Sequence, residues 1–111
     1  MSYYKDVTKE IAVNMQELGK FIPDVMTAFS ELVSSSSADG VLDKKTKELI
    51  FIAVAVANRC DGCIGFHTKK LVDAGITEQE LAEALGVAVA MGGGPSVMYA
   101  ANTIKAFKEF S

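Results

Sequence analysis

Apolar residues recur three and four positions apart along nearly the whole of this 111-residue chain, and this spacing constrains the fold more than any other feature. No stretch sustains the alternation of apolar and polar residues that is typical of strands. Only two prolines and a few glycine positions interrupt the helical spacing. We therefore expect an all-α protein of about six helices, folded as a single domain over residues 1–111.

The interruptions set the limits of the expected helices. We place them near residues 5–18, 23–34, 43–58, 60–74, 77–91 and 95–110. Asp43 is suited to cap the third helix, Thr77 and Glu80 form a capping box for the fifth, and Gly75 is suited to end the fourth. The serine-rich residues 34–40 predict a solvated loop. The second half of the third helix, residues 50–57, is apolar on every side, which predicts burial at the centre or at a subunit interface.

The apolar content is high for a chain of this length. Half of the residues are hydrophobic, whereas a chain this short buries only roughly 60–65% of the surface that it exposes when unfolded. Association of subunits is the simplest way to cover the excess. We therefore expect a homo-oligomer.

Charge and hydropathy argue against two classes of partner. The net charge is −3 and no basic cluster is present, so we expect no nucleic-acid partner. The polar first ten residues do not resemble a signal peptide. The longest apolar run, residues 49–57, is far shorter than the ~20 residues needed to span a bilayer, so we expect a cytoplasmic protein without a membrane partner.

Both cysteines and the single histidine fall within eight residues, in the pattern C-x-x-C-x-x-x-H formed by Cys60, Cys63 and His67. In a helix these spacings of three and four place the side chains on one face. A base beside a thiol favours the thiolate, which is the nucleophilic form, and a helix N-terminus favours it further. A second thiol three residues away can capture the first as a disulfide. The pattern therefore predicts a thiol–disulfide redox site.

The position of the base indicates which cysteine attacks. His67 lies one helical turn from Cys63 and two turns from Cys60. We therefore expect Cys63 to meet the substrate and Cys60 to resolve the intermediate.

Glu48 lies on the preceding expected helix and can orient the imidazole of His67 if the two helices pack as a hairpin. It lies ~16 Å before the end of its helix, whereas His67 lies ~10 Å into the next, so a bridging water or a helix crossing has to close the difference. The other interpretation is a solvated glutamate beside Lys44 and Lys47.

Two other classes of function remain open from the residues alone. Cys60, Cys63 and His67 could supply three ligands of a structural zinc site, with a carboxylate such as Glu48 as the fourth. The chain could also be a non-catalytic oligomeric protein that carries a vestigial cysteine pair. The redox interpretation itself requires neither a cofactor nor a metal.

Several segments taken together resemble the carboxymuconolactone decarboxylase family, and more narrowly its alkylhydroperoxidase D-like (AhpD-like) branch. The resemblance covers roughly residues 20–108. Its most specific part is the glutamate followed by C-x-x-C-x-x-x-H, and the remaining segments are residues 42–50, 75–85 and 91–95.

This resemblance implies an all-α fold that associates into trimers, hexamers or similar rings. It also implies a thiol peroxidase free of flavin and metal, with a hydroperoxide as substrate and a dithiol or a protein thiol as reductant. Glu48 and His67 would relay a proton from Cys63, and Cys60 would close the disulfide. The well-characterised enzymes carry a further histidine just before the second cysteine, where this chain has Gly62. Lactone decarboxylation, the reaction that names the family, is a more distant alternative because those enzymes lack the cysteine pair.

Overall fold

The computed structural model describes residues 2–111, and six α-helices account for most of them. They are α1 (Tyr3–Phe21), α2 (Pro23–Ser37), α3 (Lys44–Ala57), α4 (Asp61–Asp73), α5 (Glu78–Gly92) and α6 (Gly94–Phe110). The part of the chain thus described contains no strand, so the all-α prediction is confirmed. None of these helices is long and apolar enough to cross a membrane.

The ends of the helices follow from local chemistry that the sequence predicts. The Asp43 carboxylate accepts a hydrogen bond from the backbone N–H of Thr46 at 2.7 Å and caps α3. Thr77 and Glu80 form the expected capping box at the start of α5. Gly75 follows α4 with a φ of 78°, in the left-handed region that glycine adopts without strain.

Helix α2 is longer than predicted. It continues to Ser37, three residues beyond the expected end, so the loop predicted for residues 34–40 begins only after it. The Ser37 hydroxyl donates a hydrogen bond to the carbonyl oxygen of Ser34. Serine in the last turn satisfies backbone acceptors in this way, and a run of serines does not by itself stop a helix.

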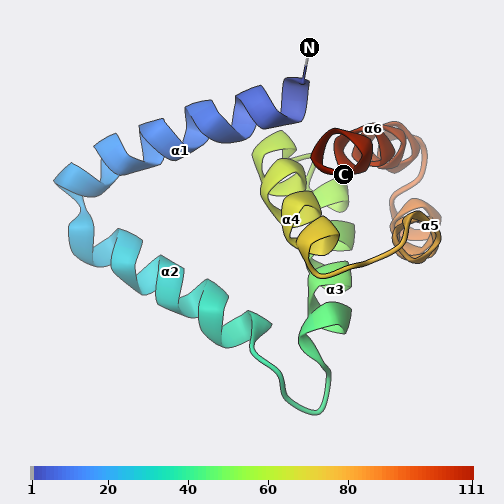
Figure 1. Ribbon diagram of the computed structural model, residues 1–111, viewed down its shortest axis with the longest axis horizontal. Coiled ribbons are helices and arrows are strands. Elements are labelled where there is room, and N and C mark those ends of the chain that lie inside the picture. Colours follow the sequence, from blue (N-terminus) through green and yellow to red (C-terminus); the bar gives the residue numbers. More distant parts are fainter. Residues whose placement is uncertain (1) are drawn as a thin grey trace.

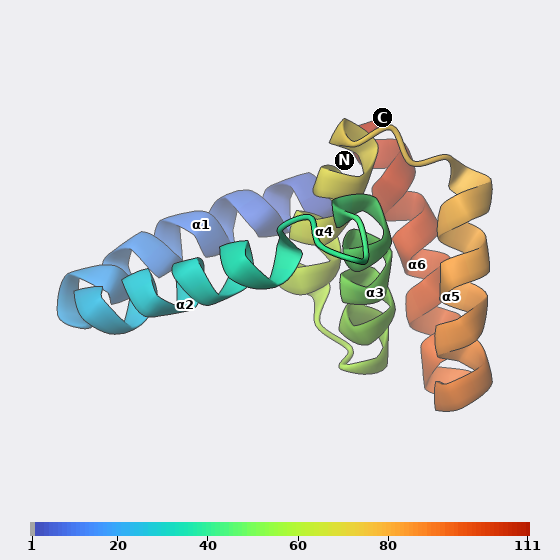
Figure 2. The ribbon, with the colours of Figure 1, turned by 90° about the horizontal axis from the view of Figure 1, so that it is seen from below.

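The molecule has two regions that differ in how they are packed. Helices α3–α6, with residues 3–11 of α1 packed across α4, form a region that we call the body (Figures 1 and 2). Residues 12–36 form a region that we call the arm, which projects from the body as the second part of α1 followed by most of α2. None of the arm's residues is buried.

The hydrophobic core lies entirely in the body. Its buried members come from α1, α3, α4, the turn after α4, α5 and α6, and they are Tyr4, Ile52, Ala55, Val56, Ile64, Leu71, Ile76, Leu81, Leu85, Ala88, Ala100, Ala106 and Phe107. Burial of these side chains supplies most of the stabilising free energy that the fold gains from the hydrophobic effect.

Of the two placements predicted for residues 50–57, burial on all sides at the centre of the subunit is wrong, and burial at a subunit interface stays a prediction. Ile52 and Val56 have no exposed surface, but Ile50 and Val54 on the opposite side of α3 are each about half exposed. The helix packs mainly against α4, α5 and α6, with a smaller contact to α2.

Candidate functional site

The cysteine pair lies at the start of α4. Cys60 is the N-cap residue, not the first helical residue as the spacing suggested, and Cys63 lies in the first turn. The two sulfur atoms are joined in a disulfide, with the Cα atoms 5.2 Å apart. The Cys60 sulfur also accepts the backbone N–H of Cys63 at 3.2 Å, so it takes the place of a capping oxygen. The site therefore combines two bonded sulfurs with the positive end of a helix.

The two cysteine residues differ in exposure. Cys63 is exposed, whereas Cys60 is only partly accessible. An attacking thiol has to reach a substrate from solvent, while a resolving thiol only has to reach its neighbour. The exposure therefore favours the same assignment as the sequence, with Cys63 as the attacking residue.

The imidazole of His67 lies between a carboxylate and an aromatic ring. Its Nδ1 is 3.0 Å from Oε2 of Glu48. Its ring also stacks on Phe51, with centroids 4.6 Å apart and planes 8° from parallel. Only 15% of the His67 side chain is exposed. These two contacts hold the ring and leave Nε2 as the nitrogen without a hydrogen bond to Glu48, while Cys63 lies one helical turn before His67 on the same helix.

The Glu48 side chain contacts His67 directly, so the bridging water that was one of the two expected ways to close the distance between them is not needed. The solvated-glutamate interpretation is also wrong, because only 2% of Glu48 is exposed. A buried carboxylate hydrogen-bonded to an imidazole orients the ring.

Helix α1 crosses the first half of α4 at two glycines. A Cβ atom at Gly62 would lie 2.6 Å from Cδ1 of Ile11, and one at Gly65 would meet the side chain of Thr8 and the carbonyl oxygen of Tyr4. A side chain at position 62 would therefore meet Ile11, and His67 is the one histidine of this chain.

Tyr3 also contacts the start of α4. Its hydroxyl donates a hydrogen bond to Oδ2 of Asp61 at 2.7 Å, next to Cys60. This hydrogen bond, with burial and the charge of Asp61, raises the pKa of the Tyr3 phenol. The contact fastens the first turn of α1 to the start of α4.

Sequence reasoning missed three of these neighbours. Phe51 lies three residues after Glu48 on the same helix, and that spacing could have identified it as a neighbour of the same imidazole. Tyr3 and Ile11 carry no such signal, because they lie 58 and 51 residues before the positions that they contact.

The described residues contain no group of three His, Cys, Asp or Glu side chains placed to hold a metal ion. In the disulfide form, the two sulfurs are bonded to each other. A zinc site built on Cys60, Cys63 and His67 does not fit this arrangement.

Comparisons with known proteins agree with the fold. The family model described as "Carboxymuconolactone decarboxylase family" matches residues 23–106. A solved structure of a family member from Legionella pneumophila has a TM-score of 0.97 at 51% identity, covering 100% of this chain and 99% of that one. Another, from Thermotoga maritima, has a TM-score of 0.77 at 28% identity and covers 90% and 88% of the two chains. For that protein, involvement in the antioxidative response has been suggested.

A more distant relative carries a specific name. The alkyl hydroperoxide reductase AhpD of Mycobacteroides abscessus is 40% identical over 52 residues, which is 47% of this chain and 30% of that protein. This match is partial, whereas the family model spans most of the chain. The protein belongs to the carboxymuconolactone decarboxylase family.

Proposed function

We propose that this protein is a thiol-dependent hydroperoxide reductase, in which Cys63 attacks the peroxide and Cys60 resolves the product. The observation that carries the proposal is the contact between Glu48 and His67 one turn after Cys63. The disulfide, the exposure of Cys63 and the partial similarity to AhpD support it further.

The reaction begins with loss of the Cys63 proton. His67 accepts this proton at Nε2, while Glu48 stabilises the resulting imidazolium through Nδ1. The thiolate attacks one oxygen of the O–O bond and becomes a sulfenic acid. The other oxygen leaves as an alkoxide and takes a proton from His67 to give the alcohol.

The second step closes the disulfide. The Cys60 sulfur attacks the sulfur of the sulfenic acid, and the hydroxyl group leaves with the Cys60 proton as water. A dithiol or a protein thiol then returns the pair to two thiols and is itself oxidised to a disulfide. One hydroperoxide and two reducing equivalents thus give one alcohol and one water.

Turnover of a hydroperoxide with a dithiol donor tests the proposal. We expect Cys63→Ser to abolish turnover, and His67→Gln and Glu48→Gln to lower it by roughly 10²–10⁴-fold, the usual contribution of general acid–base catalysis. Glu31→Gln changes a glutamate in the same way on the exposed surface of α2 and should leave the rate unchanged. Equal rates in wild type, Cys63→Ser, His67→Gln and Glu48→Gln would contradict the mechanism.

Trapping the intermediate tests the roles of the two cysteines. In the Cys60→Ser variant a sulfenic acid should accumulate on Cys63 after one equivalent of peroxide, because no resolving thiol is present. A sulfenic acid formed at the normal rate on Cys60 in the Cys63→Ser variant would reverse the assignment. Elemental analysis separates the zinc alternative, because stoichiometric zinc in the purified protein would contradict the redox proposal.

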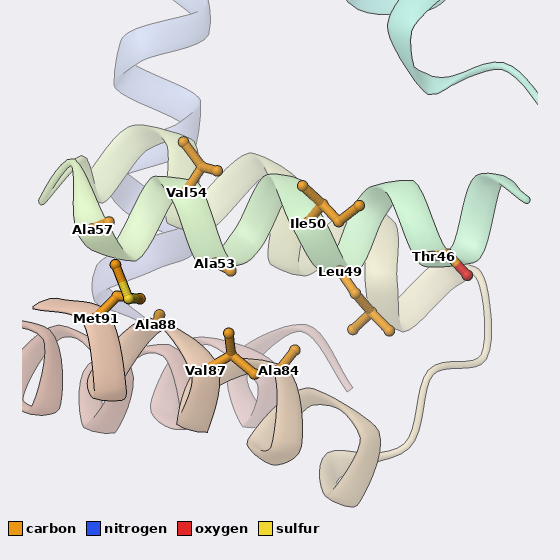
Figure 3. A pocket seen from close by; sticks show the side chains of 10 residues that line it. All are labelled: Thr46, Leu49, Ile50, Ala53, Val54, Ala57, Ala84, Val87, Ala88 and Met91. Atoms are coloured by element: carbon orange, nitrogen blue, oxygen red, sulfur yellow. The ribbon is translucent and has the colours of Figure 1, made fainter. Parts of the chain in front are cut away.

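We also propose that copies of this chain associate through their exposed apolar surfaces. One such surface is a pocket of about 420 Å³ between α3 and α5, whose lining residues are all apolar except Thr46 and include Ile50, Val54, Val87 and Met91 (Figure 3). The other is the arm, with Phe21, Phe29 and Leu32 among its exposed side chains. Exposed apolar patches of this extent are typical of surfaces that a partner covers.

A further inference from the structure

The turn between α3 and α4 holds an arginine in the left-handed region of backbone conformation. Arg59 has a φ of 54°, and among residues 2–111 every other residue with a positive φ is a glycine. The N–H of Arg59 donates to the carbonyl oxygen of Val56 at 3.0 Å, and that of Cys60 donates to the carbonyl oxygen of Ala55 at 3.2 Å. These two hydrogen bonds form a Schellman motif, in which the residue after the C-cap is usually glycine. Arg59 occupies that position.

The end of α4 provides an internal comparison. Gly75, with a φ of 78°, donates its N–H to the carbonyl oxygen of Val72 at 3.0 Å, and Ile76 donates to that of Leu71 at 3.1 Å. These hydrogen bonds span the same intervals along the chain as those at Arg59. The same backbone motif therefore contains glycine at one helix end and arginine at the other. A left-handed conformation costs free energy for a residue with a Cβ atom, and glycine avoids that cost.

No contact within the described part of the subunit offsets this cost. The Arg59 side chain is exposed, and none of the ion pairs or side-chain hydrogen bonds formed by residues 2–111 includes it. The helix dipoles do not favour its charge on balance, because it follows the negative end of α3 and precedes the positive end of α4. The guanidinium is therefore free to bind a group from outside the chain.

Arg59 lies directly before the disulfide. Adjoining Cα atoms are about 3.8 Å apart and those of Cys60 and Cys63 are 5.2 Å apart, so the Cα atom of Arg59 lies within roughly 9 Å of that of Cys63. A charge at this distance is only partly screened, since the Debye length is about 8 Å at physiological ionic strength. The chain as a whole has a net charge of −3, which repels anions. Arg59 thus supplies a local positive charge beside the sulfurs of a negatively charged protein.

Of the two molecules that the proposed reaction uses, the reductant is the one that reacts as an anion. A hydroperoxide group is neutral at neutral pH, whereas thiol–disulfide exchange proceeds through the thiolate of the attacking thiol. We propose that Arg59 is a specificity-determining residue of the reductive half-reaction, which attracts and binds the anionic reductant and favours thiols that also carry a carboxylate. The inference rests on the proposed function, since it names the class of reductant that this function needs.

The reductive step is a balanced thiol–disulfide exchange. The reductant thiolate attacks the sulfur of Cys63, the more exposed of the two residues, so that a mixed disulfide forms and the bond to Cys60 breaks. A second thiolate, from the same or another reductant molecule, attacks the reductant's sulfur in the mixed disulfide and releases Cys63. Two thiols are oxidised to one disulfide, and their two protons pass to Cys60 and Cys63. Arg59 acts on the approach and binding of the anion and takes no part in the bond changes.

Reduction of the disulfide by three matched thiols tests the proposal, with the second-order rate constant of each measured by rapid quenching. The thiols are mercaptopropionate, mercaptopropanol and mercaptopropylamine, whose thiolates are doubly negative, singly negative and zwitterionic. Arg59→Gln removes the charge and keeps a long polar side chain, whereas Arg59→Lys keeps the charge. Lys44→Gln is the matched control, because it removes the same charge from an exposed residue at the opposite end of α3, roughly 20 Å away.

We expect Arg59→Gln to slow mercaptopropionate roughly tenfold and mercaptopropanol roughly threefold, and to leave mercaptopropylamine unchanged, because the effect grows with the negative charge of the thiolate. Added salt should reduce these differences. Arg59→Lys should keep most of the preference, and Lys44→Gln should behave like wild type. Equal slowing with all three thiols would show that Arg59 acts on the sulfurs and not on the reductant. That result, or unchanged rates with all three, would overturn the inference.

Thermal unfolding of the disulfide form tests whether the arginine opposes the backbone preference. Arg59→Gly should raise the melting temperature by about 2–4 °C, because glycine relieves the left-handed conformation. Gly75→Ala, where nothing lies within 4 Å of the added atom, should lower it. A lower melting temperature for Arg59→Gly would show that the side chain stabilises the fold, and would also overturn the inference.

The two half-reactions are measured separately, so the inference and the proposed function can fail independently. Reduced wild type and reduced Arg59→Gln should react with a neutral hydroperoxide at the same rate. Slower oxidation of Arg59→Gln would place the residue in the oxidative half-reaction and contradict its assignment to the reductant. Failure of both proteins to react would refute the proposed function, while the rates with the three thiols would still decide whether Arg59 recognises anionic thiols.

Discussion

The body and the arm have similar composition but opposite packing. In the body, apolar side chains on α3–α6 meet one another, and Glu48 of α3 contacts His67 of α4. In the arm, apolar side chains recur at the same helical spacing, yet none from residue 12 to residue 36 is buried. An isolated helix of this length is marginal in water without tertiary packing. The comparison teaches that the body is a folded unit within one subunit, whereas the arm needs a further surface.

Matched leucine truncations give the largest expected contrast. Leu81→Ala in the body should lower the free energy of unfolding by about 2–5 kcal/mol, because this side chain has no exposed surface and its loss leaves a cavity. Leu32→Ala in the arm, where the side chain is 60% exposed, should change it by less than about 0.5 kcal/mol. Urea unfolding at low protein concentration measures both. A loss at Leu32 as large as that at Leu81 would show that the arm is already packed.

A pair of glycine substitutions tests whether the first part of α1 packs on α4 and so belongs to the body. Gly65→Ala should destabilise the protein by about 1–3 kcal/mol, because the added carbon meets Thr8 and Tyr4 where α1 crosses α4. Gly86→Ala on α5, where nothing lies within 4 Å of the added atom, should stabilise it by about 0.5–1 kcal/mol. Thermal unfolding of the two variants measures the difference. Equal shifts would mean that α1 does not pack on α4 as described.

Self-association tests what covers the arm. Phe29→Ser removes an aromatic ring that is 54% exposed, and should weaken association at least roughly tenfold, or about 1.4 kcal/mol. Sedimentation equilibrium across a range of protein concentrations gives the association constant. Glu31→Gln is the control on the same helix. An unchanged constant would exclude this part of the arm from the interface.

An effect confined to high pH is expected in the body, where stability should depend on the ionisation of Tyr4. Burial raises the pKa of Tyr4 from its usual 10.0 to about 12, so the folded protein holds this proton more tightly than the unfolded chain. The resulting stabilisation is complete below pH 10 and is lost as the pH rises toward 12. Tyr4→Phe should remove that part of the slope, as measured by urea unfolding at several pH values. An identical slope in both proteins would contradict the assignment.

The fold was largely predictable because its signals are local. Helical spacing indicated all six helices, and Asp43, Thr77 and Gly75 fixed three of their ends through chemistry confined to a few residues. The end of α2 was misplaced because a serine run is compatible with both helix and loop. The half exposure of Ile50 and Val54 was not predictable, because a helix that is apolar on all sides does not tell which face its neighbours cover.

The candidate site was predictable where its members share a helix. Cys63 and His67 are four residues apart on α4, and Cys60 immediately precedes that helix. The contact of Glu48 with His67 depends on how α3 packs against α4, which spacing along each helix does not determine. The contacts that α1 makes with this segment are still harder to predict, because their partners lie more than 50 residues apart in the sequence.

The contact between Ile11 and Gly62 has a consequence for how such proteins diversify. A relative with a bulky residue at the position of Gly62 has to turn the side chain at the position of Ile11 aside, carry a smaller one there, or hold its first helix farther from the fourth. The residue at the position of Gly62 and the placement of the first helix are therefore coupled. Substitutions at these two positions should be inherited as a pair.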